Sequence, residues 1–342
     1  MADLKMWGRA LTGMPRLDKE GWKRLDPIAK WLVATRAAVF IMTAISCAIG
    51  GLLAHREGLF DGRYFAACML GLVFAHATNN LLNDLTDHRR GVDRNNYYRS
   101  MYGPQPLEHG LLSESEMLRW IAATGAVALA AGIYLVLQTG TGTLSLFAAG
   151  AFFVLFYTWP LKYIGLGEPA VLAVWGPLMI GGTYYVVSGG HWSHEVMLIS
   201  LAYAIGPTTV LFGKHTDKIT EDRAKGIHTL PVILGESLSR RVTIVLWVAQ
   251  LALVAMLVAR GSLGWPLLAV FLALPTLRRS IATFRKQRPL HRPEDFPASA
   301  WPLYLSAHAF VYNRRFGLVF VAALIIDVFL RQPKSSIDIF FR

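Results

Sequence analysis

Residues 31–54 read WLVATRAAVFIMTAISCAIGGLLA and contain a single charged side chain, Arg36. A helix of this length extends about 36 Å, which exceeds the roughly 30 Å hydrocarbon layer of a bilayer. The stretch therefore predicts a membrane-spanning helix, and the same pattern recurs along most of the chain.

The composition supports a membrane protein with many spans. Hydrophobic residues make up 54% of the 342 residues and charged residues only 16%, whereas soluble chains carry about 25% charged residues. These values exclude a free cytosolic enzyme, a secreted disulfide scaffold and a disordered tail protein. We expect an all-α polytopic protein with nine transmembrane helices near 31–54, 64–83, 118–138, 141–158, 168–188, 195–213, 242–259, 261–277 and 316–330.

The spans form one predicted domain, residues 31–332, between a basic interfacial segment at 1–30 and a tail at 333–342. The apolar stretch 297–312 is an alternative tenth span. The segment 1–30 has no continuous apolar region of the kind found in a signal peptide. Its Trp7, Leu11 and Met14 are spaced as on one face of a helix lying along the membrane surface.

The net charge of +12 reflects basic loops on one side of the membrane. With the N-terminus inside, about 26 Lys and Arg residues fall on the inner side and about 6 on the outer side. The bias predicts a cytoplasmic N-terminus, an outer C-terminus and contact with the lipid bilayer, with a bacterial inner membrane as the expected location. Because the basic residues are spread over several loops, we expect no nucleic-acid partner.

Acidic and amide side chains gather where the second span ends. If the helix continues, Asp84 and Asp87 are i and i+3, and Asn80 and Asn83 lie on the same side. Carboxylate and amide oxygens suit Mg²⁺, which usually keeps waters and bridges to substrate phosphates. We therefore predict a magnesium site of Asn83, Asp84 and Asp87, supported by Asp93, with Asn80 contacting substrate.

A second acidic group follows the sixth span. On a continuous helix Asp217 and Glu221 share a face, and Asp222 lies about 140° around the axis from Asp217. Facing the first group, this second metal-binding set would hold a diphosphate between them, so that an allylic C–O bond can ionise. Four basic residues are candidates to neutralise the remaining phosphate charge: Arg99, Lys162, Lys214 and Lys218.

These motifs resemble the UbiA superfamily of intramembrane prenyltransferases. Asn83-Asp84-x-x-Asp87 followed by Asp93 is similar to the first aspartate motif of its 1,4-dihydroxy-2-naphthoate branch, in the menaquinone pathway. Further stretches are compatible with the superfamily: Gly110–Leu112, Tyr157–Lys162, Gly165–Glu168, Asp222–Gly226 and Thr229–Gly235. The resemblance implies a helical bundle with a cytoplasm-facing active site. It also implies Mg²⁺-dependent transfer of a prenyl group from its diphosphate to an aromatic acceptor, with Asp84, Asp87, Asp217 and Asp222 as catalytic acids.

The second motif departs from the family pattern, in which two Asp usually lie four residues apart. Lys218 occupies the position four before Asp222, and Asp217 precedes it. Either the metal is held by the shifted set Asp217, Glu221 and Asp222, or Lys218 replaces part of a metal's charge. We favour a role for Lys218 in gripping the diphosphate, because lysine is a usual point-charge partner of phosphate.

Aromatic faces can shield a prenyl cation from water and stabilise it by cation–π attraction. The candidates are Phe74, Tyr157, Trp159, Tyr184, Tyr185 and Phe212, of which Tyr157 is the predicted substrate contact. The histidines show no metal-ligand spacing, and we interpret them as loop residues or satisfied buried residues, with His215 as a candidate phosphate contact. Two other functions stay open, a membrane terpene cyclase and a secondary transporter. Acidic residues in the middle of spans would indicate the ion path of a transporter. Most acids here lie at span ends, which favours an enzyme, and Asp327 is the exception.

Overall fold

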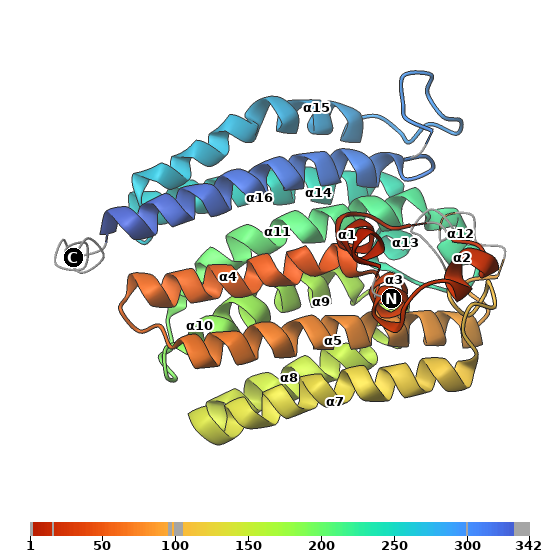
Figure 1. Ribbon diagram of the computed structural model, residues 1–342. Coiled ribbons are helices and arrows are strands. Elements are labelled where there is room, and N and C mark those ends of the chain that lie inside the picture. Colours follow the sequence, from red (N-terminus) through yellow and green to blue (C-terminus); the bar gives the residue numbers. More distant parts are fainter. Residues whose placement is uncertain (1–2, 16, 95–97, 99–104, 299, 332–342) are drawn as a thin grey trace.

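The computed structural model describes residues 3–15, 17–94, 98, 105–298 and 300–331, and every element in them is helical (Figure 1). Three short helices come first: α1 (Leu4–Thr12), α2 (Lys19–Lys23) and α3 (Pro27–Ala34). The long helices of the bundle are α4 (Phe40–Arg56), α5 (Gly62–Arg89), α7 (Glu114–Thr139), α8 (Thr141–Phe156), α11 (His194–Asp217), α14 (Glu236–Ala259) and α16 (Tyr304–Arg331). Shorter elements complete it: η1 (Ala37–Val39), η2 (Leu161–Ile164), α9 (Gly167–Ala173), η3 (Val174–Gly181), α10 (Gly182–Val187), α12 (Ile219–Ala224), α13 (Leu230–Leu234), η4 (Trp265–Ala273) and α15 (Leu274–Phe284).

The bundle has the dimensions of an integral membrane protein. Within the described residues, 8 helical stretches are long and apolar enough to cross a bilayer. They are Ala37–Arg56, Gly62–Arg89, Glu114–Thr139, Gly167–Val187, His194–Asp217, Glu236–Ala259, Trp265–Phe284 and Tyr304–Arg331. Helix α8 coincides with the fourth predicted span but has 16 residues, or about 24 Å. The all-helical membrane fold is therefore confirmed, while the count of nine spans stays a prediction.

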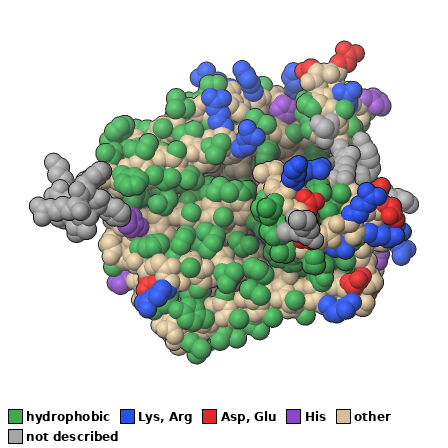
Figure 2. All heavy atoms as spheres, viewed as in Figure 1, with side chains coloured by type: hydrophobic (Ala, Val, Ile, Leu, Met, Phe, Trp, Pro, Cys, Tyr) green, Lys and Arg blue, Asp and Glu red, His purple; other side chains and the backbone are tan. Residues whose placement is uncertain are grey.

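The long connections meet at one end of the bundle. We call this the loop end and define it as the C-terminal ends of α5 and α11 with the described residues that follow them, 90–94, 105–113 and 218–235. Helices α1–α3 lie at the same end, and α16 finishes at the opposite one (Figure 1). Lys and Arg side chains gather toward the loop end, and apolar side chains cover most of the visible flank (Figure 2). The loop-end residues therefore lie at one end of the long helices, next to the flank that apolar side chains cover.

Helix α16 begins well before the predicted span 316–330. Residues 304–312 form its first turns, so within the described residues the stretch 297–312 makes no separate span. The start of the helix is stabilised by Asp217 at the end of α11, whose carboxylate accepts hydrogen bonds from the backbone N–H groups of Leu305 (3.0 Å) and Ser306 (2.9 Å). A side chain from a different helix therefore acts as the N-terminal cap.

The N-terminal segment is folded onto the loop end. Asp26 caps α3 and also accepts hydrogen bonds from the backbone N–H of Asp3 and the indole N–H of Trp7. Buried side chains of the segment belong to the same apolar cluster as side chains of residues 107–117: Met6, Ala10, Trp22 and Leu25 share it with Leu107, Leu111, Leu112 and Met117. The predicted boundary at residue 30 falls inside α3. The segment is thus packed on protein, while Leu4 and Leu11 of α1 remain exposed.

Close packing fixes the path of α4 through the bundle. A Cβ atom at Gly50 would lie 2.5 Å from the carbonyl oxygen of Ile180 in η3, so only glycine allows this approach. Proline at position 177 interrupts the ordinary helical hydrogen bonds of the α9–η3–α10 span, and η3 has π-helical geometry there. The irregular η3 lines the interior space described next.

Candidate active site

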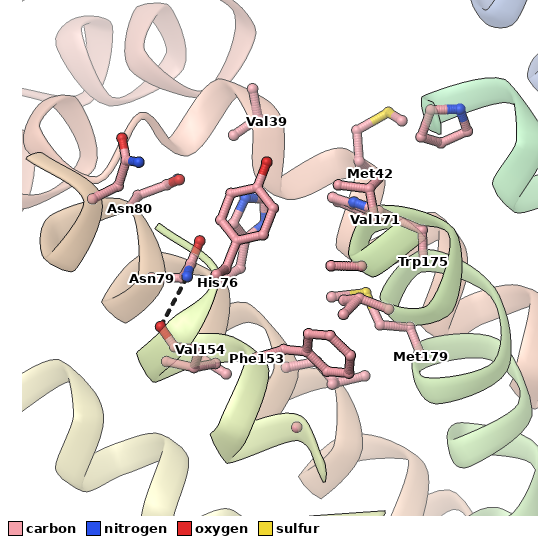
Figure 3. A pocket seen from close by; sticks show the side chains of 18 of the residues that line it. Val39, Met42, His76, Asn79, Asn80, Phe153, Val154, Val171, Trp175 and Met179 are labelled. Carbon is pink, nitrogen blue, oxygen red and sulfur yellow. Dashed lines mark hydrogen bonds between the residues drawn. The ribbon is translucent and has the colours of Figure 1, made fainter. Parts of the chain in front are cut away.

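A cavity of about 1040 Å³ runs from the loop end into the bundle, as large as the roomiest small-molecule sites of about 1,000 Å³. Its polar lining comes from the ends of α5 and α11 and the segments near them: Arg36, Asn79, Asn80, Asn83, Asp87, Asp93, Tyr157, Lys162, Lys214, His215, Lys218 and Asp222. The deeper lining is mostly apolar and includes Leu72, Ala75, Leu146, Phe147, Phe153, Val171, Trp175 and Met179. In Figure 3, Asn79 and Asn80 of α5 lie across the cavity from Val171 and Met179. His76, also on α5, contacts the ring of Trp175 edge-on.

Asp87, on the last turn of α5, is paired with a lysine. The Lys162 ammonium lies 2.9 Å from each carboxylate oxygen of Asp87, and both side chains are about nine-tenths buried. Lys162 is held in η2, at the start of the connection between α8 and α9. The predicted metal ligand and the predicted phosphate contact are therefore neighbours at the cavity wall.

A second pair of the same kind lies on the other side. Lys218 Nζ is 2.9 Å from Asp222 Oδ1, and both residues line the cavity. The second carboxylate oxygen of Asp222 is buried and has no hydrogen-bond partner among the described residues. The cavity therefore contains two acid–lysine pairs, one on the α5 side and one after α11.

The helix expected to run through the second motif is broken at Lys218. Helix α11 ends at Asp217, Lys218 has φ −113° and ψ 12°, and α12 starts at Ile219. The break changes which acids face the cavity, because i, i+4 spacing across it no longer predicts a shared face. Asp222 lines the cavity, while Asp217 and Glu221 are not part of its lining.

Three asparagines of α5 are oriented by neighbouring elements. The side-chain amides of Asn79 and Asn80 donate to the backbone carbonyls of Val154 (3.0 Å) and Thr35 (2.7 Å). The Asn83 amide donates to Thr158 Oγ1 at 3.1 Å. Because a carbonyl can only accept, the amide nitrogens of Asn79 and Asn80 must be the contacting atoms. Their Oδ1 atoms are left as acceptors at the cavity.

Asp84 lies outside the cavity lining. Its carboxylate is buried and sits 3.1 Å from the guanidinium of Arg36, which also donates to the backbone carbonyl of Asn80 at 3.0 Å. Arg36 has the left-handed backbone conformation, φ 57° and ψ 50°, which is unusual for a residue with a Cβ. The two acids of the first motif therefore have different surroundings. Asp87 lines the cavity, whereas Asp84 forms an ion pair with Arg36.

Asp217 is engaged in a structural network. Besides capping α16, its carboxylate lies 3.0 Å from Nε of Arg288, and its side chain is fully buried. The Asp217 carboxylate therefore already accepts hydrogen bonds from three donors, the backbone N–H groups of Leu305 and Ser306 and the guanidinium of Arg288. A metal ion at the predicted position would have to displace them.

We expect Asp217→Asn to lower the free energy of unfolding by about 3 kcal/mol, because it leaves Arg288 without its buried counter-charge. The substrate KM values of the folded fraction should stay within about two-fold. A thermal-unfolding series in detergent, combined with kinetics on the surviving fraction, measures both quantities. Unchanged stability together with loss of the magnesium requirement would instead support the predicted metal role.

Further contacts hold the two loop-end segments together. Lys225, after α12, donates to the backbone carbonyls of Val92 and Arg94, the latter at 3.0 Å. Burial lowers the pKa of this ammonium from its usual value. Below the cavity mouth, His215 Nδ1 is 2.6 Å from Glu168 Oε1, so one nitrogen of the predicted phosphate contact is occupied. These contacts fix the distance between the two acid–lysine pairs.

Of the remaining predicted contacts, Lys214 and Tyr157 line the cavity, and Arg99 lies outside the described residues. Among the six aromatic candidates only Tyr157 is a lining residue. The other aromatic residues of the lining are Phe147, Phe153, Trp175 and Phe310, none of which was predicted from the sequence. The lining residues Arg36 and His76 were not predicted as site residues either. No local motif marks these positions, since their exposure to the cavity depends on helix packing.

The donor set fits a hard cation shared with a substrate. Asn83 and Asp87 supply oxygens from α5, Asp93 from the segment after it, and Asp222 from α12. Within the described part of the chain, no three His, Cys, Asp or Glu side chains come close enough to form a ready-made metal site. Mg²⁺ usually keeps waters and bridges to phosphates instead of occupying an all-protein cage. The residues therefore fit an ion that enters with a diphosphate.

Fold and cavity together define a membrane-embedded enzyme whose polar mouth suits an anionic head group and whose interior suits a hydrocarbon chain. Residues 44–325 match the UbiA prenyltransferase family. Because the match covers most of the chain, the protein belongs to this family and is a prenyltransferase. The resemblance inferred from the aspartate motifs is confirmed.

Known relatives agree with this assignment. The 1,4-dihydroxy-2-naphthoate octaprenyltransferase of Haemophilus influenzae is 28% identical over 284 residues, which cover 79% of this chain and 87% of the relative. The apo structure of a UbiA homolog from Aeropyrum pernix K1 superposes with a TM-score of 0.64 at 20% identity, covering 85% of this chain and 98% of the other. A UbiA homolog from Archaeoglobus fulgidus bound to DMAPP and Mg²⁺ gives a TM-score of 0.51 at 16% identity, with coverages of 85% and 99%. These likenesses establish the fold independently of the motifs.

Proposed function

We propose that the protein transfers a polyprenyl group from an allylic prenyl diphosphate to an aromatic acceptor of the naphthoate or quinone type, in a Mg²⁺-dependent reaction that releases diphosphate. The observation that carries the proposal is the cavity, which joins two acid–lysine pairs at its mouth to a long apolar interior. A prenyl diphosphate has the same division into an anionic head and a hydrocarbon tail.

The acid–lysine pairs can exchange partners when substrate enters. Without substrate, Lys162 and Lys218 neutralise Asp87 and Asp222. A diphosphate would attract both ammonium groups, and the carboxylates of Asp87 and Asp222, with Asp93 and Asn83 Oδ1, would then be the residues that hold the accompanying cation. When bound, Mg²⁺ neutralises charge on the departing diphosphate and so favours ionisation of the C–O bond. Lys162 and Lys218 hold the phosphate oxygens as that charge develops.

The apolar lining protects the prenyl cation. Water would capture the cation, and a cavity wall of aliphatic and aromatic side chains excludes water. Tyr157, Phe153 and Trp175 present ring faces or edges to this space. A ring face near the cation adds cation–π stabilisation. The acceptor attacks the cation carbon and then loses a proton, which restores its aromaticity.

The name of one relative supports the choice of acceptor. The Haemophilus influenzae protein is named for 1,4-dihydroxy-2-naphthoate and an octaprenyl group, and the Archaeoglobus fulgidus structure contains DMAPP and Mg²⁺. We extend a naphthoate-type acceptor, a prenyl diphosphate and Mg²⁺ to this chain. We also propose that the loop end faces the cytoplasm, as the distribution of Lys and Arg predicts.

A matrix of substrates tests the proposal. Purified protein with Mg²⁺ is incubated with prenyl diphosphates of increasing length and with naphthoate, benzoate and glycerol-phosphate acceptors, and products are identified by mass spectrometry. The highest kcat/KM is expected for a dihydroxynaphthoate with a long prenyl diphosphate. A clear preference for a non-aromatic acceptor would contradict the proposal. A cyclised hydrocarbon formed without any acceptor would identify a terpene cyclase.

Lys218 provides a separate prediction at the irregular second motif. If its ammonium grips the diphosphate, Lys218→Ala should raise the KM for prenyl diphosphate by about ten-fold, as expected for loss of a charge-assisted contact worth about 1.4 kcal/mol. The acceptor KM should change little and serves as the internal control. Full activity and unchanged diphosphate affinity in Lys218→Asp would show that the position belongs to the metal instead.

A further inference from the structure

His76 is a partly buried titratable residue to which the reaction outlined above assigns no role. It lies on α5 and lines the cavity. Its Nδ1 atom is 2.7 Å from the hydroxyl oxygen of Thr43 on α4. The imidazole packs between Phe40, with ring centroids 5.5 Å apart, and Trp175, which it meets edge-on at 5.6 Å. These contacts fix the position and the plane of the ring.

The other ring nitrogen, Nε2, has no hydrogen-bond partner among the described residues. The Thr43 hydroxyl can donate to Nδ1 or accept from it, so Nε2 is either an N–H donor or a lone-pair acceptor. In both tautomers it presents one unused hydrogen-bonding position in a wall that is otherwise mainly apolar. Nε2 is accessible from the cavity, so a group that enters the cavity can form a hydrogen bond with it.

A second unused polar atom lies on the same face of α5. Asn79 is three residues after His76, and Figure 3 shows both side chains next to each other at the cavity. Since the Asn79 amide nitrogen donates to the Val154 carbonyl at 3.0 Å, its Oδ1 is the atom left without a partner among the described residues. Together His76 Nε2 and Asn79 Oδ1 form a small polar patch. Nε2 can donate or accept one hydrogen bond, depending on the tautomer, and Oδ1 can accept one.

The position of the patch excludes two of the groups that enter the cavity. His76 lies about three helical turns before Asp87, or about 16 Å along α5, so a diphosphate held by Asp87 and Lys162 does not reach it. The prenyl chain is a hydrocarbon and cannot hydrogen-bond. Among the substrates of the proposed function, only the acceptor has polar atoms that remain to be placed.

We propose that His76 and Asn79 bind an oxygen substituent of the aromatic acceptor and so set the orientation in which its ring meets the prenyl cation. This inference rests on the proposed function and deepens it. A hydroxyl group is the best match, because it can donate its one proton to Asn79 Oδ1 while its oxygen accepts from the N–H at His76 Nε2, in the tautomer in which the Thr43 hydroxyl donates to Nδ1. The edge of Trp175 and the ring of Phe153 then flank the acceptor ring. His76 is thus a specificity-determining residue that Thr43 positions.

The test compares His76→Leu, which removes the hydrogen bond, with His76→Gln, which keeps a polar end group. His194→Leu, an exposed histidine at the start of α11, is the matched control. Steady-state kinetics use a dihydroxynaphthoate and its monomethyl ethers. In His76→Leu the acceptor KM should rise about ten-fold, the effect of losing about 1.4 kcal/mol, while the prenyl-diphosphate KM stays within about two-fold. His76→Gln should recover most of the loss.

Discrimination between acceptors gives the sharper readout. The wild type should prefer the dihydroxynaphthoate over at least one monomethyl ether, and His76→Leu should lose that preference. Should His76→Leu fail to fold in detergent, Thr43→Val frees the ring without removing it and should raise the acceptor KM by a smaller factor. Prenyl-thiolodiphosphate binding confirms that the diphosphate site is intact in each variant.

Two outcomes overturn the inference while leaving the proposed function in place: unchanged acceptor KM and preference in His76→Leu, or equal increases in both KM values. His76→Gln performing no better than His76→Leu also counts against a hydrogen bond. A wild-type protein that prenylates no aromatic acceptor overturns the proposed function, and the inference with it.

Discussion

Asp87→Asn is expected to lower turnover by at least about two orders of magnitude, equivalent to about 2.7 kcal/mol of transition-state stabilisation. The carboxylate of Asp87 contacts Lys162 through both oxygens at the cavity wall. In our account it exchanges this partner for the cation that accompanies the diphosphate. An amide has the same shape but no charge, so Asn cannot hold the cation as strongly, and Lys162 loses its counter-charge in the resting protein.

Asp84→Asn is the matched control for this prediction. Asp84 lies one turn earlier on α5, is equally buried and pairs with Arg36 outside the cavity lining. We expect turnover in Asp84→Asn to fall by about ten-fold or less, since only the anchoring of Arg36 is weakened. Magnesium titrations of diphosphate release should show a raised Mg²⁺ requirement for Asp87→Asn alone. Equal losses in both variants would contradict the separation of roles.

Asp222→Asn is the second substitution with a large expected effect. Asp222 lines the cavity, pairs with Lys218 through one oxygen and keeps the other without a hydrogen-bond partner among the described residues. We expect turnover to fall by about two orders of magnitude, as for Asp87→Asn. The free energy of unfolding should fall by less than the roughly 3 kcal/mol expected for Asp217→Asn, because Lys218 and Asp222 both line the cavity and their pair does not join two long helices.

Asp217→Asn gives the opposite pattern and completes the comparison. Asp217 caps α16 and pairs with Arg288, so its loss should lower stability more than turnover. Thermal unfolding and single-turnover rates, measured on both variants in the same detergent, separate the two roles. If Asp217→Asn abolished turnover while stability stayed at the wild-type value, the result would support the metal-binding role that the sequence predicted for Asp217.

The sequence was most informative where the signal is local. Apolar runs as long as a bilayer is thick predicted every long helix, because run length can be read directly from the chain. Boundaries were less accurate where a distant residue sets them. Helix α16 starts at Tyr304 because Asp217 caps it, and no pattern near residue 304 indicates that contact.

The candidate site shows the same limit. Spacing drew attention to both acidic segments, each of which contributes an acid to the cavity lining, but it could not reveal the helix break at Lys218 that precedes Asp222. Nor could it indicate that Arg36 adopts a left-handed conformation and holds Asp84. His76 was interpreted as a satisfied or loop residue, because the single contact with Thr43 that leaves Nε2 open depends on how α4 packs against α5.

The most direct test of the central claim is the stoichiometry of diphosphate release. Purified protein is mixed with a long-chain prenyl diphosphate and Mg²⁺, with or without a dihydroxynaphthoate, and released diphosphate and prenylated product are quantified together. The account predicts one diphosphate per prenylated acceptor, little release without acceptor, and none after chelation of Mg²⁺. Rapid release that is independent of any aromatic acceptor would contradict it.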